Sequence, residues 1–206
     1  MKLLKTRLPW EPVYLRLGKV VSLSVVRNER GELLVYPPFE QVQSSAVSGT
    51  QVRYPVKLHE EVEREIRRLG RYLVETLALV GCMTVDFLVT SAGVVYINSV
   101  EIGAKDAAMF TLGAMSLSCY EAMVRSVVGL PLPSLVPLAD AAIALPLAAL
   151  NAEQVMTQYM LRTDWGFALF NPMGRNPLDL EGQVIVTGES LAHCQRQIEL
   201  TDILKK

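Results

Sequence analysis

The sequence predicts a mixed α/β protein of the α+β class, with a mainly antiparallel sheet backed by helices. Two pairs of β-branched, apolar runs are each joined by a short turn, which is typical of β-hairpins. Two longer segments, at 59–81 and 106–129, place apolar residues at helical spacing. The chain has 206 residues, of which 50% are hydrophobic and 20% charged, so it is long and apolar enough to bury a core.

The first hairpin is expected from residues 19–27 and 32–38. The segment Asn28 to Gly31 makes the turn, because glycine adopts positive φ without steric cost. Two prolines end the second strand, since proline lacks the N–H that a central strand needs. Residues 40–57 are polar and small, and they are expected to form a loop.

The segment 59–81 is expected to form an amphipathic helix with acidic residues in its first turn, where the helix dipole favours them. Its apolar positions are Val62, Ile66, Leu69, Leu73 and Leu77. A second hairpin follows, with strands at 82–90 and 93–100. Residues 106–129 are expected to form one further helix, with Asp106 as its N-cap and Gly129 at its end.

A proline-rich crossing at 130–138 suggests a division into residues 1–133 and a small closing domain, residues 134–206. Short strands are expected at 141–148, 166–170 and 182–188. A closing helix is expected at 189–204, with apolar positions Leu191, Cys194, Ile198 and Leu204.

Composition excludes several classes of function. The net charge is -1 and no run of basic residues occurs, which argues against nucleic acid or an anionic membrane as a partner. The longest apolar stretch, 137–150, contains an aspartate and two prolines and is too short to span a bilayer. The N-terminus lacks an apolar core of signal-peptide length, so a cytoplasmic location is expected. Three dispersed cysteines and two histidines indicate neither a disulfide framework nor a zinc site.

Three segments in this order carry a resemblance: 21–43, with its "YPP", then 79–98, with "VGCMTVDFLVT", then 110–133, with "VVGLPLP". They resemble the C-terminal half of carboxyaminoimidazole ribonucleotide synthetase, the ATPase subunit of phosphoribosylaminoimidazole carboxylase, an ATP-grasp enzyme. The resemblance covers residues 9–200 and is strongest from 18 to 132. It implies an ATP-grasp-like second subdomain followed by a small β-rich closing domain. It also implies dimers, and a reaction in which ATP and bicarbonate carboxylate aminoimidazole ribonucleotide.

The chain departs from this family at its nucleotide site. The family's N-terminal domain and first ATP-grasp subdomain, with its glycine-rich loop, have no counterpart in the sequence. The resemblance places Val20, or Lys19, where the family has an acid that helps hold ATP. Gln43 and "SSAVSG" stand where it has a histidine and an aspartate-glycine turn. Its first magnesium glutamate corresponds to Asp86, and its asparagine-glutamate pair to Asn98 and Ser99.

The family's substrate contacts are also replaced. Gly103, Lys105 and Asp106 stand where the resemblance implies an arginine and a His-Asn pair that face the substrate phosphate and base. An Arg-Lys pair of the closing domain corresponds to Asp179 and Leu180.

No catalytic residue is therefore assigned. Asp86 and Asn98 are the candidate cofactor-binding residues, and Asp86 is the candidate metal ligand. Magnesium needs several close oxygen ligands, so Asp86 alone makes a poor site. Glu101 is a second candidate, because alternation along a strand puts it on the same face as Ser99; the alternative is a solvated or salt-bridged glutamate.

Lys105 and Arg175 are the candidate substrate contacts. For Lys105 the alternative is that it merely precedes a helix, and for Arg175 that it is a solvated loop residue.

The main hypothesis is a truncated, catalytically inactive relative of the synthetase that acts as a binding or structural protein, most simply as a homodimer. One alternative is one part of a split ATP-dependent ligase, with the N-terminal domain on a partner chain. Another is a nucleotide or small-molecule binder that uses the cleft between the sheet and residues 40–57. No cofactor is expected, with ATP and magnesium bound only if the family site survives.

Overall fold

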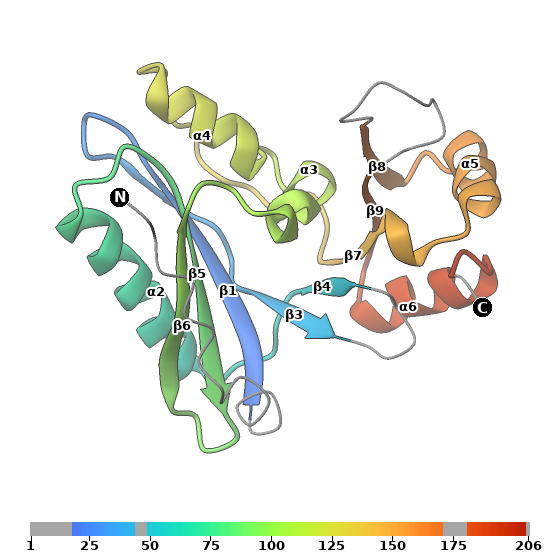
Figure 1. The fold of residues 1–206 in the computed structure, drawn as a ribbon, viewed down its shortest axis with the longest axis horizontal. Coiled ribbons are helices and arrows are strands. Elements are labelled where there is room, and N and C mark those ends of the chain that lie inside the picture. Colours follow the sequence, from blue (N-terminus) through green and yellow to red (C-terminus); the bar gives the residue numbers. More distant parts are fainter. Residues whose placement is uncertain (1–17, 44–48, 171–180, 205–206) are drawn as a thin grey trace, which may run out of the picture.

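The structure is a computed structural model that describes residues 18–43, 49–170 and 181–204. These residues form one nine-stranded sheet in the order β6-β5-β1-β3-β4-β7-β9-β8, with β2 paired to β1. Every pairing is antiparallel, and helices cover the sheet (Figure 1). The predicted fold class is confirmed.

The strands are β1 (Gly18–Arg27), β2 (Leu33–Val35), β3 (Phe39–Gln43), β4 (Thr50–Tyr54), β5 (Gly81–Thr90), β6 (Val95–Ile102), β7 (Ala141–Pro146), β8 (Trp165–Phe170) and β9 (Glu181–Gly188). The helices are α2 (Glu60–Thr76), α3 (Thr111–Ala114), α4 (Cys119–Val127), α5 (Ala152–Leu161) and α6 (Leu191–Leu200), with the 3-10 turns η1 (Asp106–Phe110) and η2 (Leu147–Ala149).

Strands β1 and β5 form the centre of the first part of the sheet and pair over their whole length, from Gly18↔Thr90 to Arg27↔Gly81. Both predicted hairpins are present, and Gly31 adopts the expected positive φ of 82°. Helix α2 covers one face and α4 the other (Figure 1). Val62 and Ile66 of α2 pack on the β1–β5 face, so the helical pattern seen in the sequence is the buried pattern.

The expected loop at 40–57 was wrong, because this segment contributes β3 and β4 to the middle of the sheet. Phe39 of β3 pairs with Ser22 of β1, and Val52 of β4 pairs with Ala144 of β7. Phe39 and Val52 are buried in the core. These polar residues form strands because the backbone of β3 pairs with β1 and the backbone of β4 pairs with β7, and both partners are distant in the sequence.

The single helix expected at 106–129 was also wrong. It is divided into η1, α3 and α4, because the backbone is extended at Met115, which forms an isolated β-bridge with Pro137. Ser118 caps α4 by accepting a hydrogen bond from the Glu121 N–H at 3.1 Å. Asp106 is the first residue of η1 and not its N-cap, which is Lys105 without a side-chain cap bond. Gly129 has the positive φ expected at the end of α4.

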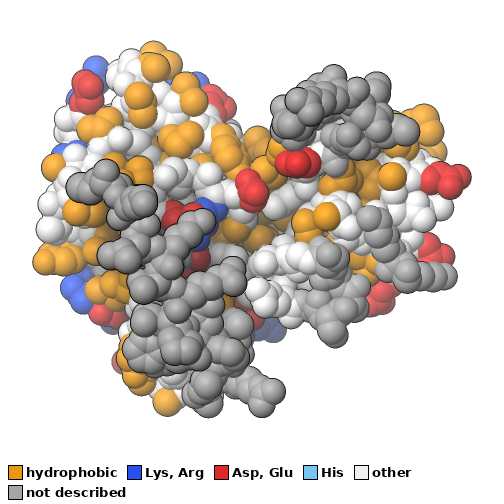
Figure 2. Space-filling model, in the orientation of Figure 1, with side chains coloured by type: hydrophobic (Ala, Val, Ile, Leu, Met, Phe, Trp, Pro, Cys, Tyr) orange, Lys and Arg blue, Asp and Glu red, His pale blue; other side chains and the backbone are white. Residues whose placement is uncertain are grey.

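The three later strands and the closing helix are present as expected, and α5 is an additional helix. Because β4 pairs with β7, the sheet continues across residue 133. The division at 133/134 stays a prediction. Figure 1 shows β1, β5, β6, α2 and α4 grouped on one side and β8, β9, α5 and α6 on the other, and Figure 2 shows acidic side chains near the middle of the molecule, between these groups.

Within the described ranges, no helix is both long enough and apolar enough to cross a membrane.

Candidate functional site

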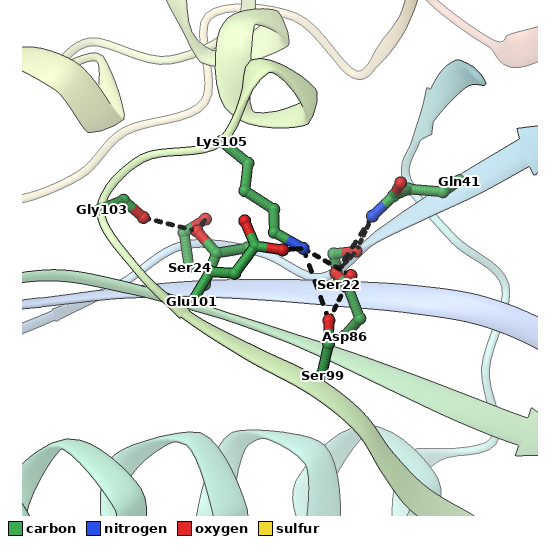
Figure 3. Close-up of polar contacts among 9 residues, drawn as sticks. Ser22, Ser24, Gln41, Asp86, Ser99, Glu101, Gly103 and Lys105 are labelled. Atoms are coloured by element: carbon green, nitrogen blue, oxygen red, sulfur yellow. Dashed lines mark hydrogen bonds and ion pairs between the residues drawn. The ribbon is translucent and has the colours of Figure 1, made fainter. Parts of the chain in front are cut away.

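Three polar side chains form a row across the sheet, one from each of three neighbouring strands. Asp86 of β5 lies opposite Ser22 of β1 on one side and Ser99 of β6 on the other. The register of β5 with β6 shifts after this row, since Phe87 pairs with Ile97 and leaves Asn98 as the extra residue of a β-bulge. The row places a carboxylate between two hydroxyls on the face of the sheet that lies beneath Lys105 (Figure 3).

The Asp86 carboxylate has a donor on every side (Figure 3). Its Oδ1 accepts hydrogen bonds from Ser22 Oγ at 2.7 Å and from Gln41 Nε2 at 3.0 Å. Its Oδ2 accepts from Ser99 Oγ at 2.9 Å and from Lys105 Nζ at 2.7 Å. The Asp86 side chain is only 10% exposed. Burying a carboxylate away from water is unfavourable unless the charge is paired and hydrogen-bonded. The four donors, all from this chain, offset the lost hydration of Asp86.

Lys105 supplies the positive charge of this site. It reaches from the segment before η1 toward the sheet, and its Nζ also lies 2.7 Å from Glu101 Oε1. Burial acts to lower the pKa of Lys105, but hydrogen bonds and charge attraction from Asp86 and Glu101 outweigh it and raise that pKa above the ordinary value. Tyr120 Oη donates to the Lys105 carbonyl oxygen at 2.7 Å, which fixes the backbone that presents the ammonium.

The predicted candidates within the described residues lie close together. Asp86 and Glu101 contact the same ammonium, and Ser99 and Glu101 share a face as strand alternation predicts. Lys105 contacts Asp86, where the resemblance implied a substrate contact. Arg175 lies outside the described residues. Their roles in ligand binding stay predictions.

A cavity of about 520 Å³ opens beside Asp86. Asp86 and Asn98 line it together with Lys19 and Val20, the positions where the resemblance implies an acid near ATP. The cavity is large enough for a small ligand. Among the described residues, no group of three histidine, cysteine or acidic side chains is arranged to hold a metal ion.

The sequence reasoning missed Ser22 and Gln41 as parts of this site. A signal for Ser22 was present, because Ser22 and Ser24 alternate with buried apolar residues along β1 and therefore share the polar face. No local signal identified Gln41, because it reaches Asp86 only through the pairing of β3 with β1.

Comparison with known proteins identifies this architecture. The model of the ATP-grasp domain matches residues 14–120. The chain belongs to the ATP-grasp family. The formate-dependent phosphoribosylglycinamide formyltransferase of Synechococcus sp. (strain RCC307) is 25% identical over 188 residues, which are 88% of this chain and 47% of that relative. The N5-carboxyaminoimidazole ribonucleotide synthase of Staphylococcus saprophyticus is 21% identical over 152 residues, 74% of this chain and 40% of the relative.

Solved structures agree with this ATP-grasp fold. An ADP complex of N5-carboxyaminoimidazole ribonucleotide synthetase superposes with a TM-score of 0.78 at 21% identity, covering 90% of this chain and 48% of that one. The synthetase from Thermotoga maritima gives a TM-score of 0.73 at 21% identity, covering 92% and 52%. The resemblance found in the sequence is confirmed. The chain spans less than half the length of the two curated relatives.

Proposed function

We propose that this ATP-grasp domain is a catalytically inactive relative of the N5-carboxyaminoimidazole ribonucleotide synthases, ligases of purine biosynthesis, and acts as a binding or structural protein. One observation carries the proposal: the ammonium of Lys105 lies 2.7 Å from the carboxylate of Asp86, the residue that corresponds to a magnesium ligand of the family. The site contains its own cation.

An ammonium cannot replace magnesium in this chemistry. Magnesium bridges phosphate oxygens because it accepts several oxygen ligands at once in octahedral geometry. Lys105 instead donates hydrogen bonds, and its nearest acceptors are Asp86 and Glu101 of this chain. The position of the second family acid is a serine, Ser99, whose hydroxyl donates to Asp86. A magnesium ion would have to displace Lys105 from both Asp86 and Glu101, and at the position of the second family acid it would meet a hydroxyl.

A thermal-shift titration of the pure chain with ADP and magnesium tests this proposal. We expect no rise in melting temperature at millimolar nucleotide, in the wild type or in Asp86→Asn. A rise that requires both magnesium and Asp86 would contradict the proposal, because ligands that bind the folded state stabilise it by mass action.

A second candidate is one part of an ATP-dependent ligase completed by another polypeptide. It is favoured by the coverage of the curated relatives, 47% and 40%, which leaves more than half of each without a counterpart in this sequence. A partner could contribute a phosphate-binding loop and lysines, but not the acids of this sheet. Co-purification of such a partner with restored ATPase activity would favour this candidate over the first.

We also propose that the protein forms a homodimer through the free edge of β6. In the described part of the chain β6 pairs only with β5, so its other edge offers unpaired backbone groups. Its exposed apolar side chains include Tyr96, Ile97 and Ile102, the last 76% exposed. Light scattering should give the mass of a dimer for the wild type and a smaller mass for Ile102→Lys. A monomeric wild type would contradict this part of the proposal.

The three free cysteines support the proposal of a cytoplasmic location. Cys82 and Cys119 are both buried, with their sulfur atoms 3.4 Å apart, and remain thiols. Free thiol pairs are typical of a reducing compartment.

A further inference from the structure

The side-chain oxygen of Gln183, on β9, has no hydrogen-bond partner among the described residues. The side chain is buried, with 6% of the residue exposed. Its Nε2 donates to the backbone oxygen of Asp106 at 2.9 Å, which fixes the orientation of the amide. The Oε1 atom accepts no hydrogen bond from residues 18–43, 49–170 or 181–204. An unpaired buried carbonyl oxygen is destabilising, so a native position of this kind calls for an explanation such as a missing ligand.

Gln183 lines a cavity of about 520 Å³, a volume typical of small-molecule sites. The cavity also touches the segment that leads into η1, through Lys105 and Asp106, and Glu101 at the end of β6. It is adjacent to the cavity beside Asp86, and Gln41 and Thr50 line both. Since Asp86 lines one cavity and Lys105 the other, their ion pair lies in the wall between them.

The charges around this second cavity favour a cation. Lys105 is the basic residue of its lining, and its ammonium is already paired with both Asp86 and Glu101. The acidic residues of the lining are Glu101 and Asp106, and both are exposed. Asp86 and Glu101 together neutralise more than the charge of Lys105, and Asp106 adds a further negative charge to the lining. Gln183 lines the same cavity, and its Oε1 has no partner among the described residues, so an unpaired acceptor and negative charge lie together in the cavity wall.

We propose that this cavity binds a small organic cation, a primary amine or guanidine, whose N–H groups donate to Gln183 Oε1 while its charge faces Asp106 and Glu101. This ligand class is opposite in charge to the phosphate-bearing substrate that the sequence resemblance implied at Lys105 and Asp106. The inference rests on the proposed function in one respect, that the domain binds a ligand and does not turn it over.

Titration calorimetry of the whole chain with agmatine, which carries a guanidinium and an amine, tests the inference. We expect saturable binding of agmatine and none of inorganic phosphate. Gln183→Met removes the acceptor and keeps the side-chain length, so it should weaken agmatine about 10-fold or more, as expected for a lost hydrogen bond to a charged group. Gln195→Met is the matched control, because Gln195 lies on α6 and bonds Glu199; it should bind agmatine as the wild type does.

Asp106→Asn provides a second variant that keeps the shape of the side chain. It should weaken agmatine several-fold, and addition of salt should weaken the wild type more than this variant. Absence of agmatine binding, equal affinity in Gln183→Met, or binding of phosphate in place of agmatine would each overturn the inference. An ADP–magnesium shift would contradict the proposed function and leave the agmatine result unchanged, so the two failures are distinguishable.

Discussion

The ammonium of Lys105 lies 2.7 Å from Asp86 and 2.7 Å from Glu101, and so joins the buried row of the sheet to a carboxylate at the end of β6. The two partners differ in burial: the Asp86 side chain is 10% exposed, and the Glu101 side chain is 57% exposed. The pair with Asp86 is therefore the stronger one, since solvent screens the pair with Glu101.

A double-mutant cycle should reveal this coupling. Asp86→Ala leaves Lys105 with a single, solvated partner and should lower the free energy of unfolding by about 3–5 kcal/mol, the range for breaking a buried pair. Lys105→Met leaves the buried Asp86 carboxylate with only neutral donors, the hydroxyls of Ser22 and Ser99 and the amide of Gln41. The double variant should lose less than the sum of the two, by more than about 1 kcal/mol. Urea unfolding measures all three, and additivity within about 0.5 kcal/mol would show that the pair is not coupled.

Alkaline pH should weaken the fold through Lys105. Because its pKa is raised in the folded state above the ordinary value of 10.5, the folded protein holds this proton more tightly than the unfolded chain. The stability that it contributes is fully present below pH 10.5 and is lost as the pH rises through the raised pKa. Urea midpoints at mildly and strongly alkaline pH should fall further for the wild type than for Lys105→Met.

Other groups also destabilise the fold at high pH, since burial raises the pKa of Tyr36 and Tyr120. Both tyrosines are present in the wild type and in Lys105→Met, so their effect on the urea midpoint cancels when the two proteins are compared. Equal losses in the wild type and Lys105→Met would contradict the role given to Lys105.

Removing the ammonium should expose a weak cation site. In Lys105→Ala, the oxygens of Asp86 and Glu101 that each lay 2.7 Å from one nitrogen face the same space. Manganese, which accepts carboxylate oxygens, should bind there. At ten times its dissociation constant it should stabilise the variant by about 1.4 kcal/mol, or roughly 3–6 °C in melting temperature.

The wild type should show no such manganese effect, and Lys105→Ala/Asp86→Asn should lose it. An identical shift in all three proteins would place the ion elsewhere.

Gly70 in the middle of α2 should resist replacement by alanine. In an exposed helix the change would stabilise by about 1 kcal/mol. Here a Cβ would overlap Leu23 Cδ2 and lie 3.3 Å from Val25 Cγ2, and both of these side chains are fully buried. Overpacking of this kind costs about 1–3 kcal/mol, so Gly70→Ala should be destabilising overall. Arg71→Ala, on the exposed face of α2, is the control. A stabilised Gly70→Ala would contradict the prediction, because it would show that Leu23 and Val25 of β1 shift to make room for the Cβ at little cost.

The elements that the sequence predicted well are those set by local patterns. Alternation and turn glycines predicted both hairpins, and helical spacing predicted α2 and α6. The capping pattern from Ser118 to Glu121 could have predicted the start of α4 as well, because serine followed by glutamate three residues later is a typical helix start.

What could not be predicted depends on contacts distant in sequence. Strands β3 and β4 are polar, and besides pairing with each other they pair with β1 and β7, which are distant in the sequence. The break at Met115 depends on Pro137, and the role of Lys105 depends on Asp86, nineteen residues earlier. The resemblance implied that Ser99 stands in place of the second family acid. It did not show that a lysine supplies the cation.

ATP turnover by the pure, whole chain tests the central claim most directly. We predict that the rate of phosphate release with ATP and magnesium equals that of a control without protein, in the wild type and in Lys105→Met alike. Turnover that is proportional to protein concentration and abolished in Asp86→Asn would contradict the account, because it would mean that Asp86 holds magnesium in spite of Lys105.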